Sequence, residues 1–123
     1  MVFHIVLFRP RADLSAGDRS ALAGAFQTAA VNIPSIRRLH IGRRVTHGRA
    51  YEQAMTEKLE YAAVLEFDNL AGLKAYLEHP LHAELGSRFL ASIGAAVIYD
   101  YEMEEGAGVG EIFEISNSDG FGC

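Results

Sequence analysis

The side chains in this chain that are best suited to chemistry lie close together, in the segment YLEHPLHAE from Tyr76 to Glu84. This segment also contains Glu78, His79 and His82. A histidine can take up a proton near neutral pH, and a neutral phenol can donate a hydrogen bond to an oxygen that gains negative charge. We therefore expect these five residues to carry any acid–base catalysis.

The apolar pattern around this segment predicts two helices with a break between them. Leucines recur at spacings of three and four along residues 69–93, which is helical periodicity, and Asn69 is a good N-cap. Pro80 lacks a backbone N–H and disfavours helical geometry at His79. The sequence therefore predicts a helix over residues 70–78, a break at His79, and a second helix with Pro80 in its first turn.

The break decides whether two of the candidates can act together. On one unbroken helix, Tyr76 and His82 would point ~120° apart because the period is 3.6 residues. A break at His79–Pro80 lets the two side chains converge, and it leaves His79 as the cap of the second helix. Two alternatives are structural: a half-buried Tyr76 whose hydroxyl bonds a carbonyl, and a His82 paired with Glu78 or a backbone carbonyl.

Two other groups of polar residues have weaker functional interpretations. His79 and His82 could bind a metal together with Glu78 or Glu84, but we expect no metal and no cofactor. The arginines Arg37, Arg38, Arg43, Arg44 and Arg49 are typical of a solvated strand face. They could also hold an anionic substrate or a carboxylate.

The composition is that of a single globular domain. The chain has 123 residues and a formal net charge of −5, which does not favour nucleic-acid binding. Its one cysteine, Cys123, cannot form an internal disulfide, which suits a reducing cytoplasm. The sequence has no apolar run of membrane-spanning length, and its N-terminus does not resemble a signal peptide. We expect a cytoplasmic protein that binds neither membranes nor nucleic acid.

The remaining patterns place strands and a further helix around the broken helix. Strands are predicted at residues 2–9, 36–45, 60–68 and 95–103, where β-branched and aromatic residues cluster. A helix is predicted over residues 15–33, and a short helical turn in the polar connection at 46–58. The order β-α-β-β-α-β predicts an α+β, ferredoxin-like fold: a four-stranded antiparallel sheet with helices on one face.

The first strand, VFHIVLFR, is apolar on both faces. We expect the helices to cover the face that carries His4, Val6 and Phe8. Phe3, Ile5 and Leu7 then lie on the uncovered face. This predicts a homodimer in which two sheets pack face to face, forming a dimeric α/β barrel. The alternative is a monomer with an exposed apolar patch.

The same alternation predicts a pocket between the sheet and the helices. An apolar pocket with a few converging polar groups is the usual form of a small-molecule site. We expect Tyr76 and His82 to face it, with His4 at its wall and His79 at its edge. Its predicted apolar lining is Val6, Phe8, Phe26, Leu65, Leu77 and Leu85.

The C-terminal residues differ in composition from the rest. Residues 105–123 are rich in Gly, Ser, Asn and acidic residues. We therefore predict a domain over residues 1–104 and a flexible tail over 105–123. The alternating residues 111–115 leave open an extra edge strand that pairs with a partner subunit.

Six segments in this order resemble the stress-responsive α/β-barrel domain family, the dimeric Dabb proteins. They are VFHIVLF, IPSI, IGRRVT, YAAVLEF, LKAYLEHPLH and IYDYEM, and they span roughly residues 2–103. The most specific is the Tyr-x-x-His-Pro-x-His pattern from Tyr76 to His82. The resemblance implies the ferredoxin-like fold and the sheet-to-sheet dimer, but it implies function poorly because many members have no known activity.

Around the broken helix, the chain is similar to the plant polyketide cyclases of this family, which are of the olivetolic acid cyclase type. That similarity implies a cofactor-free intramolecular aldol condensation of an apolar, carbonyl-bearing substrate. His82 would be the base and Tyr76 the hydrogen-bond donor, and His4 matches a histidine of the first strand. Leu22 and Ala23 stand where the plant enzyme is aromatic, so substrate specificity does not transfer. Two alternatives are a non-enzymatic stress-responsive oligomer and a cofactor-independent monooxygenase on the same architecture.

Overall fold

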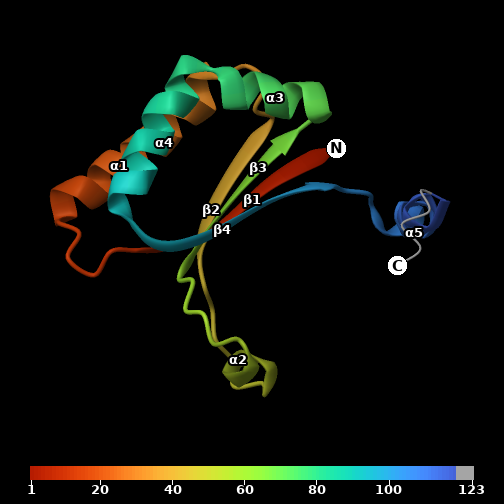
Figure 1. The fold of residues 1–123 in the computed structure, drawn as a ribbon, viewed down its shortest axis with the longest axis horizontal. Coiled ribbons are helices and arrows are strands. Elements are labelled where there is room, and N and C mark those ends of the chain that lie inside the picture. Colours follow the sequence, from red (N-terminus) through yellow and green to blue (C-terminus); the bar gives the residue numbers. More distant parts are fainter. Residues whose placement is uncertain (119–123) are drawn as a thin grey trace.

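The computed structural model describes residues 1–118 and has two layers, a sheet and a layer of helices on one of its faces (Figure 1). The sheet contains β1 (Val2–Pro10), β2 (Arg38–Arg43), β3 (Tyr61–Phe67) and β4 (Ile93–Glu102) in the antiparallel order β2-β3-β1-β4. The covering helices are α1 (Ala16–Asn32), α3 (Leu70–Glu78) and α4 (Pro80–Ser92). The predicted ferredoxin-like fold is confirmed.

The central strand β1 sets which side chains share a face. His4 lies opposite Leu65 of β3 and opposite Asp100 of β4. Because side chains alternate along a strand, these three residues point to the same face, the one that the helices cover. His4 and Leu65 are accordingly buried. Phe3, Ile5 and Leu7 point to the opposite face, which we call the open face.

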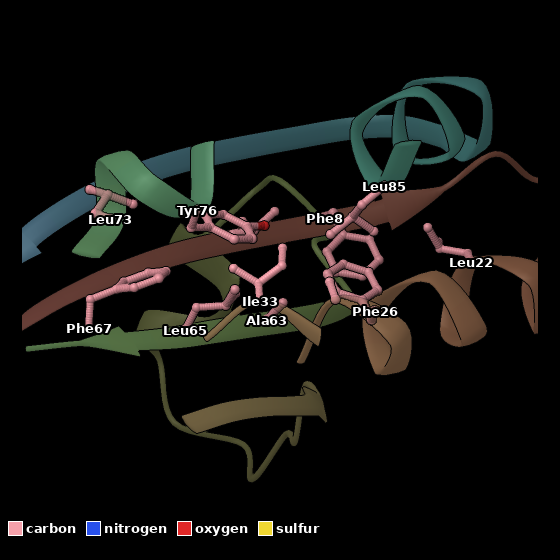
Figure 2. Close-up of a cluster of buried hydrophobic side chains, with 12 residues drawn as sticks. Phe8, Leu22, Phe26, Ile33, Ala63, Leu65, Phe67, Leu73, Tyr76 and Leu85 are labelled. Carbon is pink, nitrogen blue, oxygen red and sulfur yellow. The ribbon is translucent and has the colours of Figure 1, made fainter. Parts of the chain in front are cut away.

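Helix α1 begins and packs as its sequence predicts. The hydroxyl of its N-cap Ser15 accepts a hydrogen bond from the backbone N–H of Asp18, which satisfies one unpaired donor of the first turn. Its buried stripe faces the sheet, and Phe26 stacks on Phe8 of β1 with ring centroids 6.4 Å apart. Figure 2 shows this contact toward one end of the core, Phe67 at the other end, and Tyr76 between them.

The break between α3 and α4 lies at His79, as the sequence predicts. The Asn69 side chain caps α3 by accepting from the N–H of Gly72. His79 has extended backbone angles, φ −72° and ψ 140°, and its Nδ1 accepts from the N–H of Leu81 at 3.0 Å. His79 therefore ends one helix and caps the next, with Pro80 at the first helical position.

The predicted position of Leu77 is wrong. We expected it on the buried stripe of α3, but it is 40% exposed. Leu73 and Tyr76 take the buried positions instead, because α3 is rotated to place Tyr76 against Phe67 of β3.

Two segments extend beyond the layers (Figure 1). The connection between β2 and β3 contains the predicted short helix, α2 (Tyr51–Ala54). After β4, a 3-10 turn (Gly106–Gly108) leads into α5 (Val109–Ser118), so residues 111–115 are helical and the alternative of an extra strand there is wrong. Residues 119–123 of the predicted tail lie outside the described part. None of the helices described is both long and apolar enough to cross a membrane.

Candidate active site

Four polar side chains from four elements meet under the broken helix. They are His4 of β1, Tyr76 of α3, His82 of α4 and Asp100 of β4. The Tyr76 ring makes edge contacts with both histidines, with ring centroids 5.7 Å from His4 and 4.7 Å from His82. The predicted convergence of Tyr76 and His82 is confirmed, because the break at His79 turns the first turn of α4 back toward α3.

Tyr76 is a buried phenol whose hydroxyl is available. The residue is only 2% exposed, and its ring packs on Phe67 with centroids 5.4 Å apart. Burial raises the pKa of Tyr76 to about 12, and the negative charge of Asp100 adds to this effect. Among residues 1–118, no side chain or backbone group makes a hydrogen bond with the Tyr76 hydroxyl. In the described part of the chain, Ser35 Oγ is the only fully buried side-chain N or O atom without a partner, so the Tyr76 oxygen is accessible and free to bind a ligand atom.

His82 is held as a neutral imidazole. Burial lowers the pKa of His82 from its ordinary value, and the proximity of His4 lowers it further. A hydrogen bond to the backbone of Leu77 acts in the opposite direction. A neutral imidazole has one ring nitrogen that can accept a proton. The side chain is partly exposed, which allows a small molecule to reach it.

Asp100 is the site residue that sequence reasoning missed. Its Oδ1 lies 2.5 Å from Nδ1 of the buried His4, and about two-fifths of its side chain is exposed (43%). This contact fixes the orientation of the His4 ring and leaves Nε2 as its unoccupied nitrogen. The pairing of β1 with β4 could have indicated this residue, because the register places Asp100 directly opposite His4.

The residues predicted to line one pocket do not lie together in the structure. Val6, Leu65 and Leu85 are buried core residues. Phe8 and Phe26 line an apolar cavity of about 210 Å³, together with Leu22, Ala23 and Tyr61, but neither Tyr76 nor His82 lines it. Leu77 is exposed and so does not belong to the buried lining that we expected. Figure 2 shows Tyr76 in the middle of the core, with the Phe8–Phe26 pair on one side of it and Phe67 on the other.

The structure also bears on the alternative roles of Glu78, Glu84 and the arginines. Glu78 and Glu84 are exposed, and the described part of the chain has no group of three or more His, Cys, Asp or Glu side chains that could hold a metal ion. Arg37 pairs with Asp68, its Nη2 2.5 Å from Oδ2, on the protein surface. Neither glutamate forms an ion pair with His82 in residues 1–118.

Residues 2–103 match the sequence profile of the Stress responsive A/B Barrel Domain (Dabb) family. The match covers most of the chain, including every residue of the candidate site, so the protein belongs to the Dabb family. No curated protein matches the chain.

Several solved structures share the fold. A dimeric protein of unknown function with a ferredoxin-like fold from Bacteroides fragilis is 29% identical, with a TM-score of 0.59 over 83% of this chain and 95% of that one. A hydroxynitrile lyase from Passiflora edulis is 17% identical, with a TM-score of 0.73 over 85% and 94%. A Dabb family protein with a ferredoxin-like fold from Mesorhizobium loti is 15% identical, with a TM-score of 0.67 over 84% and 96%.

Proposed function

We propose that this protein binds a small, carbonyl-bearing molecule between Tyr76 and His82 and catalyses a cofactor-free lyase or cyclase reaction on it. One observation carries the proposal: the hydroxyl of the buried residue Tyr76, which has no hydrogen-bond partner in residues 1–118, lies beside a histidine whose lowered pKa keeps it neutral. The pair combines a hydrogen-bond donor that does not ionise with a base that is ready to accept a proton.

The reaction begins with proton transfer to His82. Its free nitrogen takes a proton from a carbon between two carbonyl groups, and the C–H electron pair moves onto a carbonyl oxygen. Tyr76 donates a hydrogen bond to that oxygen and stabilises the enolate. The enolate carbon then attacks a second carbonyl of the same molecule. One C–C bond forms, and the new alkoxide takes back the proton from His82. The substrate itself is the electron sink.

The same two groups suit a lyase. For an adduct in which a carbon carries both a hydroxyl and a leaving group, His82 removes the hydroxyl proton and the carbonyl forms as the leaving group departs with its electron pair. Tyr76 donates to the oxygen on which charge develops. The hydroxynitrile lyase from Passiflora edulis shows that the fold can host a lyase, but at 17% identity it supports no more than that.

The exposure of the four side chains indicates the path of entry. Asp100 and His82 are partly exposed, whereas Tyr76 and His4 are almost fully buried. A substrate therefore approaches past His82 and places its oxygen at the Tyr76 hydroxyl. The apolar cavity of about 210 Å³ lies apart from this path, and neither Tyr76 nor His82 lines it.

We also propose that the protein is a homodimer formed through the open face of the sheet. Phe3, Ile5 and Leu7 lie on that face beside Tyr99 and Tyr101 of β4, which are 56% and 50% exposed. No helix of residues 1–118 covers this face (Figure 1). A contiguous apolar surface of this kind is typical of a subunit interface. The Bacteroides fragilis structure, 29% identical, is described as dimeric and supports this proposal.

The test of the proposed activity is turnover of small β-keto compounds and of cyanohydrins by the wild type, Tyr76→Phe and His82→Ala. We expect a loss of roughly 10²–10⁴-fold in kcat for His82→Ala, because the base is removed. Tyr76→Phe keeps the ring and loses the donor, so kcat should fall by ~10²-fold or more with little change in KM. Tyr61→Phe and Glu84→Gln are the matched controls. If all five proteins behave alike, a role limited to assembly remains.

A further inference from the structure

A groove lies beside the edge strand β2, between the sheet and the β2–β3 connection. It has a volume of about 760 Å³. Leu7 and Ala62 of the open face line its inner end, and Val45, Met55 and Leu59 line the connection. Val45 and Met55 are 79% and 58% exposed, so the apolar floor has no cover in residues 1–118. We call this hollow the β2–α2 groove.

The outer wall of the β2–α2 groove is held by its own hydrogen bonds. The Glu52 carboxylate accepts from the backbone N–H groups of His47 and Gly48, and the Tyr51 hydroxyl lies 2.6 Å from Nε2 of His47. Gly48 has φ +88°, a backbone conformation that favours glycine. The groove is therefore formed before anything binds in it, which lowers the entropic cost of docking.

The C-terminal arm, residues 103–118, has two exposed apolar side chains, Val109 and Phe113. Figure 1 shows α5 standing clear of both layers. Val109 and Phe113 are four residues apart on this helix and so share a face. They are 44% and 67% exposed. A helix of ten residues that stands alone in water is only marginally stable, so α5 needs a partner surface.

The groove has two arginines without an acidic partner. Arg43 and Arg44 line it, and within residues 1–118 neither forms an ion pair with a carboxylate. Two glutamates line it as well, but Glu52 accepts from backbone N–H groups and Glu57 lies 3.7 Å from Arg9. The arm carries Glu104, Glu105 and Glu111, and the sequence contains no Lys or Arg after Arg88. The acidic residues of the arm therefore complement the two arginines of the groove that have no acidic partner.

The arm and the groove lie at diagonally opposite corners of the open face. Glu102, where β4 ends, is paired with Val2 at the start of β1, whereas Arg43 at the groove is aligned through Tyr61 with Phe8 near the end of β1. A two-fold axis along the other diagonal exchanges these corners between two facing sheets. It makes their strands cross at about 90°, which is one of the two common packings. Residues 103–108 can span up to ~20 Å when extended, enough to cross to the partner.

We infer that α5 of one subunit docks in the β2–α2 groove of a second copy of this chain. Val109 and Phe113 cover the apolar floor, and the acidic residues of the arm face Arg43 and Arg44. The inference rests on the homodimer proposed above, but not on the proposed activity. The arm follows the family domain, which ends at residue 103, so it adds to this chain a contact that the family match does not contain.

The test is a cross-link between two different subunits. Two full-length variants are coexpressed, one with Phe113→Cys and one with Met55→Cys, and both carry Cys123→Ser so that each chain has a single thiol. A short bismaleimide is added at low micromolar protein concentration. The mixed covalent dimer should form at least ~10-fold faster than with Leu90→Cys in place of Met55→Cys, because docking raises the effective concentration of the thiol. Leu90, 80% exposed on α4, is the matched control.

Two further measurements make the result decisive. Arg44→Glu together with Arg43→Glu should slow the cross-link, and added salt should slow it in the wild-type background. Light scattering on the same samples reports the oligomeric state. A dimer that cross-links no faster than the Leu90 control overturns arm docking and leaves the homodimer. A monomer overturns both, while the turnover assay still decides the activity. Cross-linking of Phe113→Cys to itself would place the two arms against each other and would also overturn the inference.

Discussion

The rings of Tyr76 and His82 meet edge to face, with centroids 4.7 Å apart and planes at 68°, although the two residues belong to different helices. This contact exists because the chain leaves the helical conformation for one residue, His79. The candidate site thus depends on a local backbone feature that single substitutions can change.

Replacing Pro80 should disturb this contact. Pro80→Ala restores a backbone N–H and removes the restriction on His79, so the two helices can merge into one. His82 would then rotate away from Tyr76, and turnover should fall toward the level of His82→Ala. Circular dichroism should show a gain in helix, and NMR should show a loss of contacts between the two rings. Unchanged ring contacts and turnover would mean that packing alone holds the break.

The acid limb of the pH profile should come from His82. Because the pKa of His82 is lowered in the folded protein, turnover should rise with pH through that lowered value and then stay level. The unfolded state binds this proton more readily, so the stability that His82 contributes is present above pH ~6.5 and is lost as the pH falls through the folded pKa. Urea unfolding of the wild type and His82→Gln between pH 4 and 8 checks this. Parallel curves for the two proteins would rule it out.

The alkaline limb should come from Tyr76. Its pKa is about 12 in the folded protein against 10.0 ordinarily, so the folded state holds this proton more tightly. The resulting stabilisation is complete below pH 10 and is lost as the pH rises toward 12, a change of ~3 kcal/mol in the free energy of unfolding. Tyr76→Phe should lack this loss, whereas Tyr61→Phe should keep it. Denaturant unfolding at pH 8 and pH 11 provides the measurement.

Asp100 should act as a positioning residue. Asp100→Asn keeps an oxygen that can contact His4 but removes the charge, so the pKa of Tyr76 should fall while the fold is unchanged. An ultraviolet titration of the phenol, with Tyr76→Phe as the subtraction control, measures this. We expect kcat to fall more than KM rises, because the substrate pocket is intact. An unaltered Tyr76 titration would show that the Asp100 charge does not reach the phenol.

The open face should be an interface. Ile5→Glu places a charge in the middle of the apolar face, where an unpaired buried charge is strongly unfavourable. The wild type should be a dimer by light scattering at micromolar concentration, and this variant a folded monomer, since Ile5 does not face the core. Glu84→Gln, on the outside of α4, should remain a dimer. A monomeric wild type would refute the homodimer.

Local signals in the sequence predicted much of the fold. Asn69, His79 and Pro80 act on their own backbone or on that of near neighbours, so their effect could be derived without knowing the rest of the chain. The alternation of β1 likewise separated His4 from Ile5 correctly. Features that depend on how distant elements meet were harder to predict. Leu77 is exposed because of how α3 is rotated on the sheet. Asp100 joins the site because its strand pairs with the strand of His4, which is 96 residues away in the sequence.

The C-terminal arm shows a different reason why sequence patterns fail to predict structure. Residues 111–115, EIFEI, have apolar residues at positions that satisfy both a period of two and one turn of a helix. A segment this short does not distinguish strand from helix by its pattern. The structure has a helix, α5, which stands clear of both layers.

Tyr61 lies at an edge of the sheet where it lines a hollow on each face. Its residue lines the apolar cavity of about 210 Å³ on the helix side and also the β2–α2 groove on the other side. Its ring stacks on Phe8 with centroids 5.7 Å apart. At this edge of the sheet, one aromatic residue is thus the partition between two hollows. A substitution such as Tyr61→Ala would therefore change the walls of both hollows at once, although they lie on opposite faces of the sheet.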